Sequence, residues 1–404
     1  MCSPLSSYIK ELILIRLTGT TAVGLRLPFI NHGDDLAAIT VDHVLAHLSN
    51  EGRQLKPTDI IAVTEGIVAK AEGNFATIDQ LAADVREKFG DAEIGLVYPI
   101  LSRNRFLNIL KGIAQGAKRL HILLSYPHDE VGNPIMDITH LDDTIDRLQN
   151  RMVTAAEFRA AAGEFVHTFT GVDYIDLYES VGPHVSVYFS NDPRDILKLT
   201  PYVCVTEIHN RFNTKARLLK AGAKTVYTLS DLLNRSVNGS GYNSEYGVLG
   251  SNLSTENTLK LFPNQAPAFV QTVQNLLKER TGVAPEVMVY GDGAFKDPVC
   301  GIWELADPVV SPGHTPLLAG RPSEIKLKLV ADQAFGTLRG EEQRVAVTEA
   351  VRRKHNDPLA FREGTTPRVY ADLLGSLCDL MSGSGDKGTP VIFISGYFDD
   401  YATE

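Results

Sequence analysis

The chain has 404 residues with a formal net charge of -10, and 44% of its residues are hydrophobic. This length allows about two or three domains and a full hydrophobic core. Lys and Arg are scattered without a dense basic run, so we expect no nucleic-acid partner, because such binding needs a basic surface. The cysteines, Cys2, Cys204, Cys300 and Cys378, form no C-x-x-C pair, which favours reduced thiols in a cytoplasmic protein over a zinc ribbon.

Short apolar runs along the chain predict a series of β-strands. The first run, residues 11–16, is too short for a signal peptide or a membrane helix and is typical of an opening strand. Further runs predict buried strands at 59–64, 120–125, 201–206, 224–228, 287–290 and 391–395. Amphipathic patterns predict helices at 35–48, 266–280 and 367–381, the last with Thr366 as a cap and Gly383 just past its end. This alternation predicts a mixed α/β or α+β protein. From the short first apolar run we expect no membrane partner.

Two charged segments near the N-terminus have more than one explanation. Residues 31–36 contain Asp34 and Asp35 directly before a predicted helix, and helix capping is favoured there over a metal site. Residues 64–73 follow a buried strand, and Glu65, Lys70 and Glu72 interrupt an otherwise apolar stretch. Charged side chains in such a stretch must form ion pairs, be exposed to solvent or contact a ligand. The spacing of these charges is equally consistent with a Lys70 that binds phosphate and with a Lys70 in a structural ion pair.

Three glycine-containing segments in the second half are also ambiguous. Residues 236–251 are rich in Gly, Ser and Asn, which is typical of a linker, but they carry more apolar side chains than a linker needs. Asp292 lies between two glycines after a predicted strand, where it could bind Mg2+ or belong to a hairpin turn. Residues 383–388 fit G-x-G-x-x-G but follow a helix and precede a strand, which is the reverse of the dinucleotide-binding order. They could cradle phosphate or form a surface turn.

Taken together, these segments resemble the coenzyme F-420-0:L-glutamate ligase (gamma-glutamyl ligase) family. The resemblance lies in Leu27-Pro28 with Gly33-Asp-Asp-Leu36, in the strand from Asp59 with Ile67-Val-Ala-Lys-Ala-Glu-Gly73, and in 245–252 with Leu261-Phe-Pro263. It continues in Asp292-Gly293 and in 365–396. These motifs occur in the family's order over roughly residues 20–105 and 240–400.

The resemblance implies an enzyme that adds L-glutamate to a cofactor carboxylate through an acyl phosphate. It implies GTP or ATP as co-substrate, Mg2+ or Mn2+, a deazaflavin (F-420-0) or folate acceptor, and a homodimer. It assigns catalysis to Lys70 and Glu65. Nucleotide binding is assigned to Thr64, Asn252, Gly383, Ser384, Gly385 and Lys387, and metal binding to Asp292 and Glu245.

The chain also departs from the family pattern. The family's metal-binding Asp falls on Leu249, which leaves Glu245 as the nearest acidic candidate, and the Thr after the strand-end Asp is Gly293. Residues 106–235 have no counterpart in the family. We therefore expect an α+β fold, a ligase core of mixed sheets and helices formed by 1–105 and 236–404, with an inserted α/β domain at 106–235. The insertion includes Glu207-Ile-His-Asn-Arg211 after a strand, where an ordinary loop is favoured over a part of the site.

Two other functions remain open from the sequence. The loss of an acidic residue at Leu249 is consistent with a catalytically silent nucleotide-binding module. Acidic residues at strand ends also occur in metal-dependent phosphohydrolases, and formation of an amide product would separate that class from a ligase.

Overall fold

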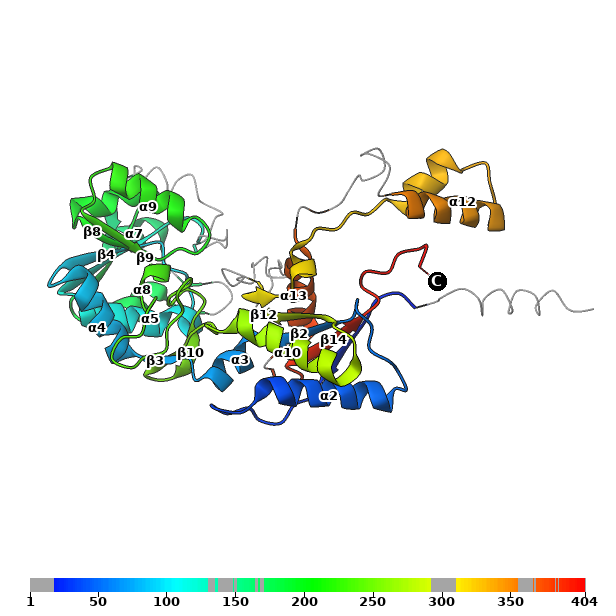
Figure 1. Cartoon of the computed structure of the whole chain (residues 1–404). Coiled ribbons are helices and arrows are strands. Elements are labelled where there is room, and N and C mark those ends of the chain that lie inside the picture. The colour runs from blue at the N-terminus through cyan, green and yellow to red at the C-terminus, as the bar shows by residue number, and fades with distance from the viewer. Residues whose placement is uncertain are drawn as a thin grey trace, which may run out of the picture.

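The protein has an α+β fold built on three sheets (Figure 1). The computed structural model describes residues 18–129, 135–136, 148, 151–163, 166–167, 171–291, 310–354, 366, 368–381, 383 and 385–403. The predicted opening strand at 11–16 lies outside these residues. Among the described helices, none is both long enough and apolar enough to cross a bilayer.

A five-stranded sheet forms the centre of the molecule in Figure 1. Its strand order is β1 (Thr21–Leu25), β14 (Val391–Ser395), β2 (Ile60–Thr64), β12 (Glu286–Tyr290) and β13 (Gly313–His314). β2 and β12 run parallel, and the other neighbours are antiparallel. β2, β12 and β14 are buried on both faces, which explains why these runs are continuously apolar in sequence.

Helices cover both faces of this sheet. One face packs against α2 (Leu36–Asn50), α3 (Glu65–Glu72) and α10 (Ala266–Thr281), and the other against α13 (Tyr370–Met381). The predicted cap of α2 is confirmed, because the Asp35 carboxylate accepts a hydrogen bond from the Ala38 N–H at 3.0 Å. α13 begins at Tyr370, whose N–H donates to the Gly320 carbonyl, so the helix starts later than predicted.

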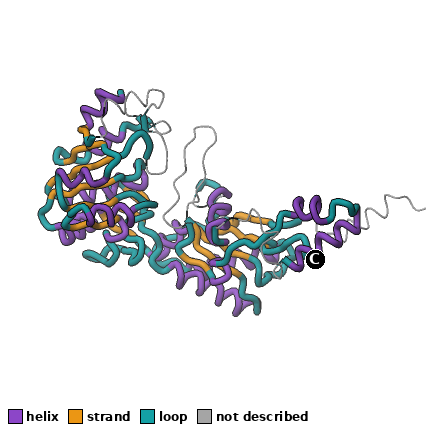
Figure 2. The backbone as a smooth tube through the Cα atoms, turned by 90° about the horizontal axis from the view of Figure 1, so that it is seen from above, coloured by secondary structure: helices purple, strands orange, loops and turns teal. Residues whose placement is uncertain are grey.

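A six-stranded sheet lies at one end of the molecule (Figure 2). Its order is β6 (Val153–Thr154), β7 (Val185–Phe189), β5 (Arg119–Leu124), β4 (Glu93–Val97), β8 (Tyr202–Val205) and β9 (Thr225–Thr228). The helical segments around it are α4 (Ile78–Phe89), α5 (Arg103–Gly116), α7 (Ala155–Ala162), α8 (Tyr174–Glu179), η1 (Pro193–Lys198), α9 (Arg211–Lys220) and η2 (Leu229–Asp231). Because β4 belongs to this sheet, its strands are not confined to residues 106–235. The division at 105 and 235 into domains remains a prediction.

A small third sheet and a helical arm complete the described chain. The sheet orders β10 (Asn252–Thr255), β11 (Thr258–Lys260) and β3 (Phe75–Thr77), and it packs on α4 and α5. η3 (Pro316–Ala319) packs on α13 with Leu318 buried, and the arm contains α11 (Leu327–Leu329), η4 (Val330–Ala334) and α12 (Gly340–Arg353). Figure 1 shows α12 at the end of the molecule opposite the six-stranded sheet.

Residues 236–251 form packed turns and not a solvated linker. Val248 and Leu249 are buried in the core of the six-stranded unit. The buried Asn74 side chain holds the segment, since its amide donates to the carbonyls of Tyr242 (3.0 Å) and Phe262 (2.5 Å). Its carbonyl oxygen accepts from the Tyr242 N–H at 2.9 Å. The apolar residues noticed in the sequence are therefore core residues.

We predict that Asn74→Ala lowers the free energy of unfolding by about 3 kcal/mol, because it removes these buried hydrogen bonds and leaves their partners unsatisfied. Urea unfolding followed by circular dichroism measures the change. Asn275→Ala, at an exposed position of α10, is the matched control and should change the stability by less than about 0.5 kcal/mol. Equal effects of the two variants would contradict the role given to Asn74.

Candidate functional site

A cavity of about 820 Å³ opens where β2 ends and α3 begins. Its walls come from five stretches of the chain, 27–30, 64–75, 252–260, 379–385 and 388–390. Polar and charged side chains enter it from several of these, and they are Thr64, Glu65, Lys70, Asn252, Ser254, Lys260 and Asp379. A cavity of this size accommodates a nucleotide-sized ligand.

The floor of the cavity is the junction between β2 and α3. Thr64 is the N-cap residue of α3 without a side-chain capping bond, and the first turn of the helix lines the cavity. The N-terminal N–H groups of a helix attract anions, because they lack partners within the helix. The Thr64 N–H donates to the Pro390 carbonyl at 2.9 Å, which ties the 383–390 loop to the same junction.

A close contact at Gly73 positions the opening loop. Gly73 ends α3 in the left-handed conformation (φ 71°), and a Cβ there would lie 2.2 Å from the His32 ring. The Gly33 N–H also donates to the Ala71 carbonyl at 3.0 Å. These contacts hold the loop at Gly33 against the end of α3 at Gly73. They place residues 27–30, with the almost fully exposed Phe29, along the cavity.

Glu65 pairs with Lys260 and not with Lys70. The Lys260 ammonium lies 2.5 Å from the Glu65 carboxylate, and both side chains are mostly buried, at 16% and 7% exposure. Glu65 begins α3, whereas Lys260 ends β11 of the three-stranded sheet. The ion pair therefore joins the two sheets across the cavity. Lys70 is exposed and lines the same cavity.

Glu72, the third charge of the 64–73 segment, has a structural role. Its carboxylate accepts hydrogen bonds from the backbone N–H groups of Asn264 (2.9 Å) and Gln265 (3.0 Å). Gln265 precedes α10, so Glu72 satisfies N–H groups at the start of that helix. Burial raises the pKa of Glu72, while the two backbone hydrogen bonds lower it.

A second polar wall comes from α13 and the loop that follows it. Asp379 of α13 and Gly383, Gly385 and Gly388 of the loop line the cavity. The loop joins α13 to β14, so the predicted order of helix, glycine loop and strand is confirmed. Beneath this wall lies the buried Tyr290, whose pKa is raised mainly by burial.

The structure brings together six of the residues named in the sequence analysis. Thr64, Glu65, Lys70, Asn252, Gly383 and Gly385 all line the cavity. Ser384 and Asp292 lie outside the described residues. Lys387 is exposed and does not line the cavity, and its ammonium lies 3.4 Å from the Met381 carbonyl.

Glu245 also lies outside the cavity lining. It is exposed in the turns after β9, with its N–H donating to the Asn243 side chain at 3.0 Å. After burial, a hydrogen bond to Glu245 is the next cause that raises the pKa of Tyr246. Leu249 is only 1% exposed within the core, so a carboxylate at that position would be buried among apolar side chains.

Sequence reasoning missed Lys260 and Asp379. Lys260 stands in the apolar run Leu259-Lys-Leu-Phe262, so it is a charge in a buried strand, the same signal that drew attention to Lys70. Asp379 falls on the amphipathic α13, where an acidic side chain is unremarkable in sequence. Only the packing of α13 beside β12 brings it to the cavity.

The described residues alone supply too few ligands for a divalent metal, which would need phosphate oxygens as well. Within the described residues, no three His, Cys, Asp or Glu side chains gather closely enough to hold an ion. Glu65 and Asp379 are acidic residues that line the cavity. One or two carboxylates plus substrate phosphates are a common ligand set for Mg2+.

We predict that Lys260→Met destabilises the protein by about 3 kcal/mol, because Glu65 keeps its buried charge and loses the ammonium beside it. The double variant Glu65→Gln with Lys260→Met should recover most of this loss, since no buried carboxylate remains. Denaturant unfolding of the three variants forms a double-mutant cycle. If the losses of unfolding free energy are additive, Glu65 and Lys260 contribute to stability independently, which would contradict this prediction.

The chain matches the family model described as F420-0:Gamma-glutamyl ligase over residues 24–396. A search of curated proteins finds no match to the chain.

Proposed function

Because the chain belongs to the F420-0:gamma-glutamyl ligase family, we propose that it is a nucleotide- and metal-dependent gamma-glutamyl ligase. It joins the amine of L-glutamate to a carboxylate of an acidic cofactor. The co-substrate is GTP or ATP, with Mg2+ or Mn2+. The observation that carries the proposal is the convergence of Thr64, Glu65, Lys70 and Asn252 with the glycine loop on one cavity.

The charges around the cavity suit a nucleotide triphosphate. Lys70 is exposed at the cavity and the N–H groups at the start of α3 carry partial positive charge, whereas the charge of Lys260 is offset by Glu65. The glycines at 383, 385 and 388 let the backbone approach phosphate oxygens. A bound divalent metal would neutralise phosphate charge and polarise the phosphoryl group. Asp379 is a described residue that could hold it, together with Asp292 as the family resemblance implies, whereas Glu245 lies outside the cavity and takes no part.

The chemistry proceeds in two displacements. A carboxylate oxygen of the acceptor attacks the terminal phosphorus, the bond to the nucleoside diphosphate breaks, and an acyl phosphate forms. The glutamate amine then attacks the acyl carbon, loses a proton, and phosphate leaves as the amide forms. In this proposal Lys70 stabilises negative charge on the transferred group, and Glu65, which is ion-paired with Lys260, accepts the amine proton.

The acceptor is the F-420 precursor or a folate that carries a terminal glutamate. The family favours F-420-0. The family model matches across residues 106–235, so the expectation that this segment lacks a family counterpart is not confirmed, and a folate acceptor stays the second alternative. We include a cytoplasmic location and a homodimer in the proposal on the basis of the family resemblance.

A catalytically silent nucleotide-binding module is the second candidate function. The burial of Leu249 in the core favours it, because this position cannot supply a carboxylate to a metal. It differs from a ligase in binding nucleotide without turnover.

Mass spectrometry of the reaction products tests the proposal. We expect protein incubated with L-glutamate, Mg2+ or Mn2+, GTP or ATP, and either F-420-0 or a folate to convert one acceptor into a product heavier by one glutamyl unit. Removal of the divalent ion with a chelator should abolish the conversion. Nucleotide binding without any product would support the silent module instead.

We further predict that Lys70→Met lowers the rate of product formation about 100-fold or more, because a preorganised cation is lost from the phosphate site. Lys278→Met, at an exposed position of α10, is the matched control and should retain the wild-type rate. If the two variants form product at equal rates, Lys70 does not contribute to the phosphate site.

A further inference from the structure

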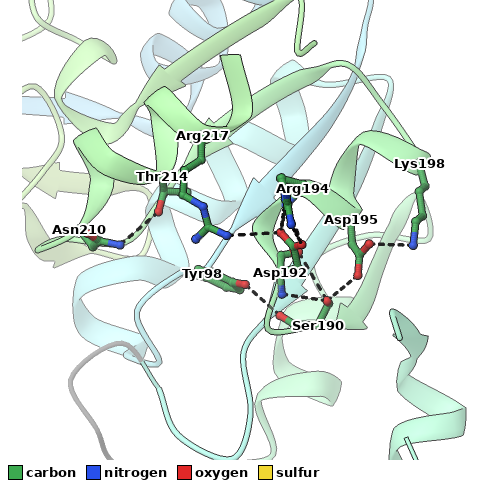
Figure 3. Close-up of polar contacts among 9 residues, drawn as sticks. All are labelled: Tyr98, Ser190, Asp192, Arg194, Asp195, Lys198, Asn210, Thr214 and Arg217. Atoms are coloured by element: carbon green, nitrogen blue, oxygen red, sulfur yellow. Dashed lines mark hydrogen bonds and ion pairs between the residues drawn. The ribbon is translucent and has the colours of Figure 1, made fainter. Parts of the chain in front are cut away.

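The carboxyl edge of the six-stranded sheet leaves little room for a ligand among the described residues. Parallel α/β sheets commonly bind ligands at this edge. Here Tyr98, which follows β4, donates its hydroxyl to the Ser190 carbonyl at 3.0 Å, and Arg217 of α9 extends toward Asp192 beside them (Figure 3). The space left beside Tyr98 is about 10 Å³, which holds at most one water molecule. We therefore looked for ligand-sized space elsewhere in this unit.

A second cavity, of about 530 Å³, lies beside the amino-terminal end of β7. One wall is a face of α5, where Leu107, Lys111 and Ala114 follow one another at helical spacing. The facing wall comes from the end of α8 and the turn that leads to β7. The start of α4 and the turn between β10 and β11 complete the lining. This volume is in the range of pockets that bind small organic molecules.

Hydrogen bonds between the walls fix the shape of this second cavity. The His184 Nε2 lies 3.0 Å from the Ala114 carbonyl, so this nitrogen carries a proton and ties the turn before β7 to α5. The buried Asn108 of α5 donates its amide to the Thr255 carbonyl at 3.1 Å, which holds the β10–β11 hairpin against the same helix. The cavity is therefore formed before any ligand binds, and binding there needs little rearrangement.

The lining of the second cavity combines apolar side chains with one ammonium group. The apolar part is made mainly by Ile78, Leu107, Leu177 and Val181. Lys111 is half-buried, and within the described chain it makes no ion pair. The Asp79 carboxylate accepts a hydrogen bond from the Gln115 amide at 2.7 Å and does not line the cavity. A partly desolvated ammonium without a counter-ion favours an anionic ligand.

We propose that this second cavity binds a small carboxylic acid with an apolar body, its carboxylate on Lys111 and its body against the apolar side chains. One ammonium matches the single charge of a carboxylate, and the apolar walls favour a ring or a branched alkyl chain over a polar body. The second cavity is separate from the cavity beside Lys70, since the two share no lining residue. The inference therefore does not depend on the ligase activity.

Saturation-transfer NMR of the full chain with benzoate, phenylacetate and isovalerate tests the proposal. We expect at least one of these acids to bind saturably, and benzamide, which lacks the charge, to bind more weakly than benzoate. Lys111→Met keeps a side chain of similar length and should weaken binding of the acid about tenfold or more, because the charge-assisted contact is lost. Lys118→Met is the matched control, because Lys118 is exposed just after α5, does not line the cavity and should leave the affinity unchanged.

The outcomes separate the second cavity from the ligase cavity. The absence of saturable binding by all three acids, or binding that survives Lys111→Met, would overturn the proposal. If Lys70→Met removes binding while Lys111→Met does not, the acid occupies the ligase cavity and the proposal is also wrong. Unfolding curves report whether the variants fold, and Val181→Trp gives a second variant, which should abolish binding by filling the cavity. Loss of ligase activity alone leaves the result at Lys111 unaffected, so the two proposals fail separately.

Discussion

The contact between Glu65 and Lys260 connects the parts of the molecule that form the cavity. Glu65 stands at the end of a strand buried on both faces, and Lys260 ends a strand that packs on α4 and α5. Few buried carboxylates are tolerated without a neutralising partner. The ion pair therefore constrains how the three-stranded sheet meets the five-stranded sheet. It also leaves Lys70 exposed at the cavity, available to a ligand.

Much of the fold could be predicted from the sequence, because its strands are short apolar runs. The runs at 60–64, 286–290 and 391–395 are buried in the five-stranded sheet, and the α2 cap at Asp35 lies where the local chemistry predicts it. The pairing of these strands was not predictable, since it joins residues more than 200 positions apart. The start of α13 was predicted too early: the Thr366 hydroxyl accepts a hydrogen bond from the Arg368 N–H at 3.2 Å, but the helix itself begins at Tyr370, whose N–H donates to Gly320.

Part of the candidate site could also be predicted, because some of its residues are placed by local sequence and the others by tertiary packing. Thr64 ends β2, and Glu65 and Lys70 lie in the helix that follows it directly, so their position at the strand end is a local property. Lys260 and Asp379 reach the cavity only through tertiary packing, and Glu245 is kept away from it by the turns that bury Leu249. The order of the strands around β4 could not be predicted, because single runs of sequence do not reveal which strands are neighbours. For residues 207–211, sequence reasoning favoured an ordinary loop.

The central claim is that residues from distant segments form one nucleotide site at the end of β2. Photoaffinity labelling with azido derivatives of GTP and ATP, followed by peptide mapping, tests it most directly. We expect competition-sensitive labels on peptides from 64–75, 252–260 and 379–390, which line the cavity. Labels confined to the loops of the six-stranded sheet, around 98–102 and 206–211, would place the nucleotide elsewhere and contradict the account.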